Sequence, residues 1–259
     1  MTTACTMAPP GIAQLERLAG ATPMIAIDNL VAGYAGMEVL HGFSLRLARG
    51  GSLCLIGPNG AGKSTVLHAI FGLTRVISGT VMVDGVNVTP LRPEQKLRQV
   101  GMAYVLQESA IFPDMTVEEN LRMGGYLMRH PAEAAAAAER VCQRYGALAQ
   151  RRHQRASVLS GGERRLLEIA RALMMDPAIL LVDEPSIGLE PRYVDMVFGL
   201  LRQLQQAEGK TIILVEQNAR KGLAFADLGY VLVDGQLAMA GTGAELSHDP
   251  EVARLFLGA

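Results

Sequence analysis

Short runs of apolar and β-branched residues dominate the first third of the chain and predict strands. They cover residues 24–27, 39–47 and 53–56, and at this length a strand is favoured over a helix. Residues 80–88 hold two further runs around Asp84-Gly85, a turn sequence that suits the twist of an antiparallel hairpin. We therefore expect a β-rich N-terminal portion that includes antiparallel strands.

The pattern then changes twice. Residues 116–128 and 131–148 have apolar positions at helical spacing, which predicts an inserted helical subdomain over about residues 108–176. The later part alternates again, because strands are predicted at 179–182, 211–215 and 230–233, with a helix at 190–206 between them. Strands that alternate with helices form a mostly parallel sheet covered by helices, so the core is expected to be α/β.

Residues 1–23 stand apart from this pattern. They contain Pro9, Pro10, Gly11 and Gly20, with a short possible helix only at residues 12–18. We interpret them as a loosely ordered tail ahead of one domain over residues 24–259.

Composition narrows the class of protein. The 259 residues are 49% apolar, which is enough for a full core, and the net charge of −1 gives no sign of a nucleic-acid-binding surface. The three cysteines are too scattered for a disulfide framework or a zinc cluster. No run approaches the roughly 18 apolar residues that a membrane span needs, and the N-terminus has no signal-peptide pattern. The sequence therefore predicts a soluble, cytoplasmic protein whose membrane role, if it has one, comes through a partner.

A phosphate-binding loop is the first chemical motif. Residues 57–65 match G-x-x-x-x-G-K-[ST], follow a short apolar strand and open a helix that runs to about Phe71. Glycines let the backbone aim its N–H groups at phosphate oxygens, and the helix N-terminus favours negative charge. Lys63 is expected to reach the β- and γ-phosphates of a nucleotide, and the Ser64 hydroxyl to bind Mg²⁺. The residues of the loop are Gly57, Pro58, Asn59, Gly60, Ala61, Gly62, Lys63, Ser64 and Thr65.

A second motif places two acids at the end of a strand. Residues 178–182 are apolar and are followed by Asp183 and Glu184, so both carboxylates are expected at the carboxyl edge of the sheet, where ligands bind in open α/β folds. Asp183 suits Mg²⁺ binding and Glu184 suits a general base that activates water. Acid pairs also end strands without any function, but here the phosphate loop lies upstream in the same chain.

A third motif is Leu159-Ser160-Gly161-Gly162-Glu163, ahead of a predicted helix over residues 164–175. Ser160 and Glu163 fit a capping box, which accounts for both residues structurally. The two glycines weaken a helix, and their exposed N–H groups suit an anion, so the capping box does not explain them.

With these motifs the sequence resembles an ABC ATPase over its length from Met24. Residues 159–163 resemble the signature motif of that family, and residues 185–190 its D-loop, with Glu190 where Asp is usual. The resemblance implies that Tyr34 stacks on adenine and that Gln107 contributes to catalysis and to Mg²⁺ binding with Ser64 and Asp183. It also implies a P-loop NTPase core with an antiparallel β subdomain and a helical subdomain.

Further consequences of the resemblance concern partners. Two such subunits sandwich two ATP molecules, so that Lys63 of one faces Ser160, Gly161, Gly162 and Glu163 of the other. This implies a second ATPase subunit, and a membrane permease that contacts the surface near Gln107 and residues 116–121.

One position departs from the family. Gln217 stands where these ATPases usually carry a histidine that contacts the γ-phosphate, and no histidine lies between His153 and His248. Two interpretations stay open. Gln217 donates a neutral hydrogen bond and turnover is slower, or the chain pairs with a different ATPase that carries the histidine.

The same departure points to a subfamily. Residues 215–220, 115–121, 186–189 and 229–232 resemble the smaller ATPase of branched-chain amino acid importers. Those work with a non-identical second ATPase, two permeases and a substrate-binding protein, and their relatives carry urea or short amides. By contrast, residues 164–173 and 107–112 resemble a lipopolysaccharide-export ATPase, in which His is expected at position 217.

Other classes of ATPase fit less well. A DNA-repair or chromosome ATPase needs a long coiled coil between its motifs, and the 120 residues from Lys63 to Asp183 leave no room for one. A translation-factor type needs a second cassette, and a non-hydrolysing module would lose Glu184. An adenylate-kinase-like enzyme does not need residues 159–163.

Overall fold

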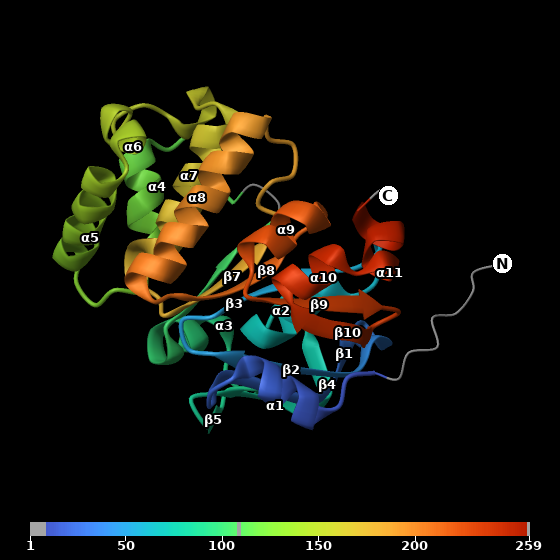
Figure 1. The fold of residues 1–259 in the computed structure, drawn as a ribbon. Helices are drawn as coiled ribbons and strands as arrows, with labels where there is room; N and C mark the ends of the chain where they lie inside the picture. The colour runs from blue at the N-terminus through green and yellow to red at the C-terminus, as the bar shows by residue number, and fades with distance from the viewer. Residues whose placement is uncertain (1–8, 108–109, 258–259) are drawn as a thin grey trace. The chain divides into compact units, whose positions relative to one another are not determined.

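The computed structural model describes residues 9–107 and 110–257. The chain divides into two compact units: the terminal unit, residues 1–91 and 211–259, and the central unit, residues 92–210. Both are shown in Figure 1. None of the helices in the described ranges combines the length and the apolar character that crossing a bilayer requires.

An antiparallel sheet forms one part of the terminal unit. Its strand order is β2-β1-β4-β5, and the predicted hairpin is present as β4 and β5, with Asp84 and Gly85 at φ 49° and 75° in its turn. A non-glycine residue with positive φ is uncommon, and Asp is among the residues that tolerate it. The strands are β1 Pro23–Tyr34, β2 Met37–Ala48, β4 Arg75–Val83 and β5 Val86–Asn87.

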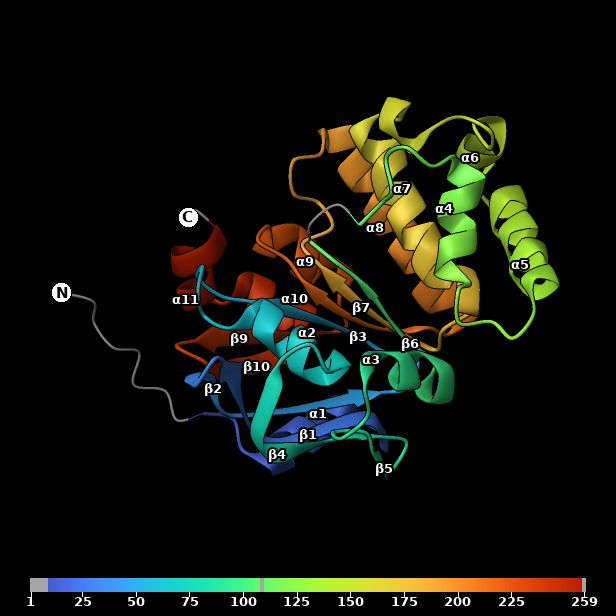
Figure 2. The same cartoon turned by 180° about the vertical axis from the view of Figure 1, so that it is seen from behind.

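A second group of strands in the same unit is mainly parallel. The strand β3, Ser52–Ile56, pairs in parallel with β8 on one side and β9 on the other, and β10 pairs antiparallel with β9. All five residues of β3 are buried, as its continuous apolar run predicts. The helix α2, Lys63–Phe71, follows β3 and packs against strands of both groups (Figure 2). The remaining elements are β8 Thr211–Val215, α9 Ala219–Phe225, β9 Leu228–Val233, β10 Gln236–Thr242, α10 Gly243–His248, α11 Pro250–Val252 and a π-helical turn Ala253–Leu257.

The predicted N-terminal tail is partly ordered. Residues Ile12–Ala19 form helix α1, which packs on β2, and its Leu15 side chain is fully buried. Burial of one leucine side chain contributes about 2 kcal/mol to stability, which stabilises the packing of this short helix on β2. Helix α1 lies where a short helix was expected as a possibility, and residues 1–8 lie outside the described residues.

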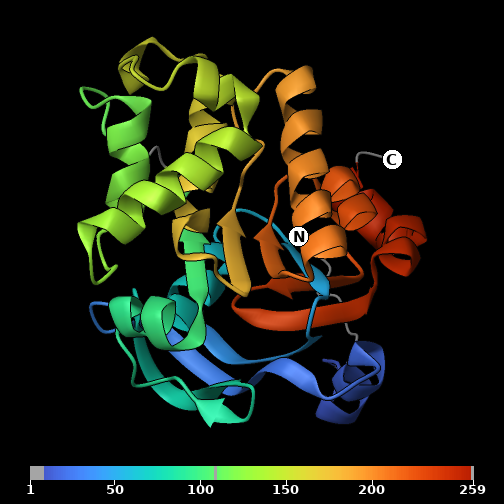
Figure 3. The same ribbon diagram turned by 90° about the vertical axis from the view of Figure 1, so that its left-hand side faces the viewer.

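The central unit holds a pair of parallel strands and a set of helices. The strand β6, Met102–Val105, pairs with β7, Ile179–Asp183, in the register Val105 to Val182. Figure 3 looks onto α5, which lies across α4. The helices are α3 Pro93–Gln95 with the π-helical turn Lys96–Val100, α4 Val117–Gly124, α5 Pro131–Arg144, α6 Gly146–Gln150, α7 Gly161–Ala172 and α8 Pro191–Glu208, with 3₁₀ turns at Ala156–Val158 and Leu173–Met175.

Two predicted helices are shorter than expected. Helix α4 stops at the pair Gly124-Gly125, and glycine is a poor helix former. The second predicted helix is divided at Tyr145, whose φ of −113° and ψ of 87° are not helical. These glycines and this break, not the apolar spacing, set the helix ends. The α/β fold class with an antiparallel sheet and a helical part is confirmed.

Candidate functional site

The phosphate loop joins β3 to α2 in the terminal unit. At Gly57, φ is 154°, and a Cβ atom there would lie 2.2 Å from the backbone oxygen of Leu232, so only glycine fits. The Lys63 side chain is buried, and its Nζ donates to the backbone oxygens of Gly57 and Pro58 at 2.9 Å each. The loop thus curls around the lysine at the N-terminus of a nine-residue helix, which is the arrangement that suits a phosphate group.

An aromatic side chain belongs to the same unit. Tyr34, at the end of β1, is 41% exposed. Its hydroxyl is hydrogen-bonded to Nδ1 of His68 on α2, and the two rings meet edge to face with centroids 6.1 Å apart. The Tyr34 ring is therefore held at its edge by His68. Sequence reasoning selected Tyr34 but missed His68, since a lone histidine four residues after Ser64 carries no motif.

The unusual Gln217 contacts the loop directly. It lies just after β8, and its Nε2 is 3.4 Å from Oδ1 of Asn59. Both side chains are exposed. The structure therefore brings Gln217 and the phosphate loop together within the terminal unit, and a glutamine amide there is a neutral hydrogen-bond donor.

The acid pair lies in the central unit, where β7 ends. Asp183 is 2% exposed and Glu184 is 5% exposed. The Tyr104 hydroxyl donates to Asp183 Oδ2 at 2.8 Å, and Gln107 Nε2 donates to Glu184 Oε2 at 2.8 Å. The structure therefore brings Gln107 and the acid pair together within the central unit. Tyr104 was missed, since β7 lies far along the chain from it and no local motif connects the two.

The signature residues open helix α7. The capping box is real, because Ser160 N donates to Glu163 Oε2 at 2.8 Å and Glu163 N to Ser160 Oγ at 3.3 Å. Burial alone would raise the pKa of Glu163, but the hydrogen bonds from Ser160 and the ion pair with Arg151 outweigh it and hold that pKa below its usual range. The helix begins at Gly161, ahead of the predicted residue 164, because the cap extends it.

The two signature glycines differ in their surroundings. A Cβ atom at Gly161 would meet only Leu189 Cδ2, at 3.7 Å, whereas one at Gly162 would lie 2.0 Å from Cδ1 of Tyr193. Gly161 is exposed and Gly162 is buried. Gly161 therefore has room for a ligand, while Gly162 is required by packing against α8.

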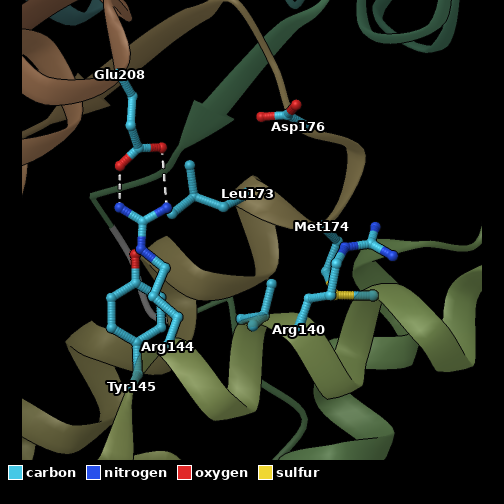
Figure 4. A pocket seen from close by; sticks show the side chains of 8 residues that line it. Arg140, Arg144, Tyr145, Leu173, Met174, Asp176 and Glu208 are labelled. Atoms are coloured by element: carbon cyan, nitrogen blue, oxygen red, sulfur yellow. Dashed lines mark hydrogen bonds and ion pairs between the residues drawn. The ribbon is translucent and has the colours of Figure 1, made fainter.

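A separate cavity lies elsewhere in the central unit. It has a volume of about 270 Å³, and Arg144 closes one side of it through a two-pronged ion pair with Glu208 (Figure 4). Its lining includes Tyr145 and Asp176 but none of the predicted site residues. It is not part of the candidate nucleotide site.

The residues present fit a nucleotide phosphate, since the phosphate loop offers helix N–H groups, a buried lysine and a glycine cradle that a Cβ would fill. A site for a metal ion held by the protein alone is not found among the described residues. Among residues 9–107 and 110–257, no cluster of three or more His, Cys, Asp or Glu side chains is placed to hold an ion by itself. The oxygens of Ser64, Asp183 and Gln107 are of the kind that Mg²⁺ prefers.

Comparison with known proteins agrees with this chemistry. The family model for the ABC transporter family matches residues 40–187. The branched-chain amino acid transport ATP-binding protein BraG of Pseudomonas aeruginosa is 38% identical over 91% of this chain and 100% of its own. The probable branched-chain amino acid transport ATP-binding protein LivF of Archaeoglobus fulgidus is 34% identical over 91% of this chain and 99% of its own. A lipopolysaccharide-export ATP-binding protein, LptB of Haemophilus influenzae, matches at 31% over 91% of this chain and 97% of its own.

The fold comparison leads to the same family. A crystal structure of an ATP-binding cassette of an ABC transporter in its ADP conformation matches with a TM-score of 0.80 and 27% identity. It covers 92% of this chain and 100% of its own. The motifs, the fold and the relatives agree, and this chain belongs to the ATP-binding subunits of ABC transporters, which bind and hydrolyse ATP and work with membrane permeases.

Proposed function

We propose that this chain powers the import of branched-chain or similarly hydrophobic amino acids. The observation that carries the proposal is the 38% identity to BraG over the whole length of that protein. Gln217 supports it, because the lipopolysaccharide-export ATPases that the signature helix resembles are expected to carry histidine there. An ATPase subunit does not contact the solute, so its residues do not select among related solutes. Because relatives of these importers carry urea or short amides, import of those solutes is the nearest alternative.

Lipopolysaccharide export is the second candidate. The resemblance of residues 164–173 and 107–112 to the export ATPase favours it. The lower identity to LptB, 31% against 38%, speaks against it.

The residue roles follow from the chemistry of each group. Lys63 and the backbone N–H groups that the phosphate loop offers hold the ATP phosphates, and the Tyr34 ring stacks on adenine. Ser64, Asp183 and Gln107 would hold Mg²⁺, which would supply neutralisation of the phosphate charge. Glu184 takes a proton from the attacking water, a role supported by its hydrogen bond with Gln107. Gln217 donates a neutral hydrogen bond to the γ-phosphate.

The signature residues act on a second molecule of ATP. Ser160, Gly161, Gly162 and Glu163 open a helix whose N-terminus favours an anion, and they complete the site of a partner ATPase subunit that is not identical to this chain. Two permeases and, indirectly, a substrate-binding protein complete the importer. The chain acts at the cytoplasmic face of the cell membrane.

Uptake of labelled leucine tests the solute assignment. Cells that lack the gene are complemented with the wild-type chain or with Lys63→Ala. Restored uptake with the wild type but not with Lys63→Ala is expected. If the wild type restores no deficit in leucine uptake, the amino acid assignment is wrong, and urea, short amides and lipopolysaccharide are tested in the same strains.

A further inference from the structure

A buried arginine beside the signature ties several loops of the central unit together. Arg165 lies on α7, two residues after the signature, and is 6% exposed. Its guanidinium has five N–H groups, and five hydrogen bonds from it are formed. Four go to backbone oxygens and one, at 2.7 Å, to the carboxylate of Glu168.

The four backbone oxygens are not scattered. They belong to Leu106 at 2.9 Å, Asp183 at 3.2 Å, Glu184 at 2.9 Å and Pro185 at 3.0 Å. Leu106 directly precedes Gln107, and the other three run through the acid pair into the D-loop. One planar group on the signature helix therefore fixes the backbone at the ends of both strands, β6 and β7.

The backbone at this point needs fixing. Glu184 has a φ of 42°, and a non-glycine residue in the left-handed region costs on the order of 1 kcal/mol and persists only where its surroundings hold it. Arg165 donates to the carbonyl of Glu184, and Gln107 donates to its carboxylate. Both contacts restrain the same residue from opposite ends.

We propose that Arg165 is a positioning residue for hydrolysis. It holds the Glu184 carboxylate and the Gln107 amide at a fixed place relative to the signature helix, without touching nucleotide itself. The role depends on geometry more than on charge, because a lysine ammonium is a single point that cannot reach four carbonyls on a planar fork. The inference rests on the roles proposed above for Glu184 and Gln107.

The consequence for kinetics is a split between turnover and affinity. The phosphate loop, which supplies most of the proposed phosphate contacts, belongs to the terminal unit, so loss of Arg165 is expected to change ATP affinity much less than turnover. Misplacement of the base by about 1 Å costs roughly 100-fold in turnover. If Arg165 acted only in folding, its replacement would lower the melting temperature and the active fraction, but kcat per folded molecule would be unchanged.

The test compares Arg165→Met and Arg165→Lys with the wild type. The transporter complex is purified through a tag on this chain, and kcat, KM for ATP, ATP affinity and melting temperature are measured. Both variants are expected to lose at least about tenfold in kcat with KM nearly unchanged. Arg144→Met is the matched control, since Arg144 also donates to a carboxylate of the central unit, that of Glu208. It should lower the melting temperature and leave kcat unchanged.

Each outcome has one meaning. Wild-type kcat in folded Arg165→Met or Arg165→Lys overturns the inference, as does a loss confined to KM. If both fail to fold, Glu168→Gln replaces them, because it keeps the guanidinium and weakens only its anchor. A lowered kcat then supports the inference and an unchanged kcat overturns it. Glu184→Gln is measured in parallel to separate the proposal for Arg165 from that for Glu184. ATP hydrolysis by Glu184→Gln at the wild-type rate would refute the role of Glu184 itself.

Discussion

The two signature glycines provide a sharp test, because only one of them is sterically constrained. A Cβ atom at Gly162 would lie 2.0 Å, 2.3 Å and 2.5 Å from three ring atoms of Tyr193, whereas one at Gly161 would make a single contact at 3.7 Å. Non-bonded carbon atoms prefer separations of about 3.5–4.0 Å. For Gly162→Ala the Tyr193 ring must therefore move by about 1.5 Å, and for Gly161→Ala nothing must move.

The magnitude follows from two opposing effects. Overpacking costs about 1–3 kcal/mol, and the better helix propensity of alanine returns up to about 1 kcal/mol. We expect Gly162→Ala to be destabilised by about 1–2 kcal/mol, a fall of roughly 2–8 °C in melting temperature for a chain of this size. Gly161→Ala should melt at or slightly above the wild-type temperature.

Thermal unfolding of both variants, alone and combined with Tyr193→Ala, measures the effect. When the ring of Tyr193 is removed, Gly162→Ala should cost nothing further, because the obstruction is gone. Equal melting temperatures for Gly161→Ala and Gly162→Ala would contradict the reasoning. So would a penalty for Gly162→Ala that persists without the Tyr193 ring.

Three further predictions concern other parts of the two units. Tyr34→Phe removes the hydroxyl that bonds to His68 and should weaken ATP binding about fivefold; His68→Leu should add nothing in that background, as isothermal titration would show. Gln217→Ala removes a neutral donor and should lower kcat by about tenfold or more, and an unchanged rate of phosphate release would refute its role. Hydrogen bonds from Arg152 hold the pKa of Glu118 at about 2, below its ordinary 4.5. The stability it contributes is therefore present above pH 4.5 and lost as the pH falls towards 2; Glu118→Gln should flatten the melting temperature over this range.

Motif chemistry was predictable because it depends on neighbours in sequence. The phosphate loop, the acid pair at the end of β7 and the capping box of α7 each have their own local sequence pattern. Contacts between distant segments left no such pattern. The hydrogen bond from Arg165 to the carbonyl of Leu106 joins residues 59 positions apart, and no sequence pattern near either residue predicts it.

Elements with a weak local pattern also depend on tertiary contacts. Helix α1 was expected only as a short possible helix, and the burial of Leu15 stabilises it. The strand β10 was missed because its burial is uneven along Gln236–Thr242, so its pattern is weak. In each case tertiary contacts, which composition and period do not describe, decide the outcome.

The central claim is that the phosphate loop binds ATP and that Glu184 drives its hydrolysis. The most direct test measures Mg·ATP affinity and phosphate release by the purified complex with Glu184→Gln, beside wild type and Lys63→Ala. We expect Glu184→Gln to keep or tighten ATP binding while hydrolysis falls by about 100-fold or more, and Lys63→Ala to lose affinity or turnover. Hydrolysis by Glu184→Gln at the wild-type rate would show that Glu184 is not the general base.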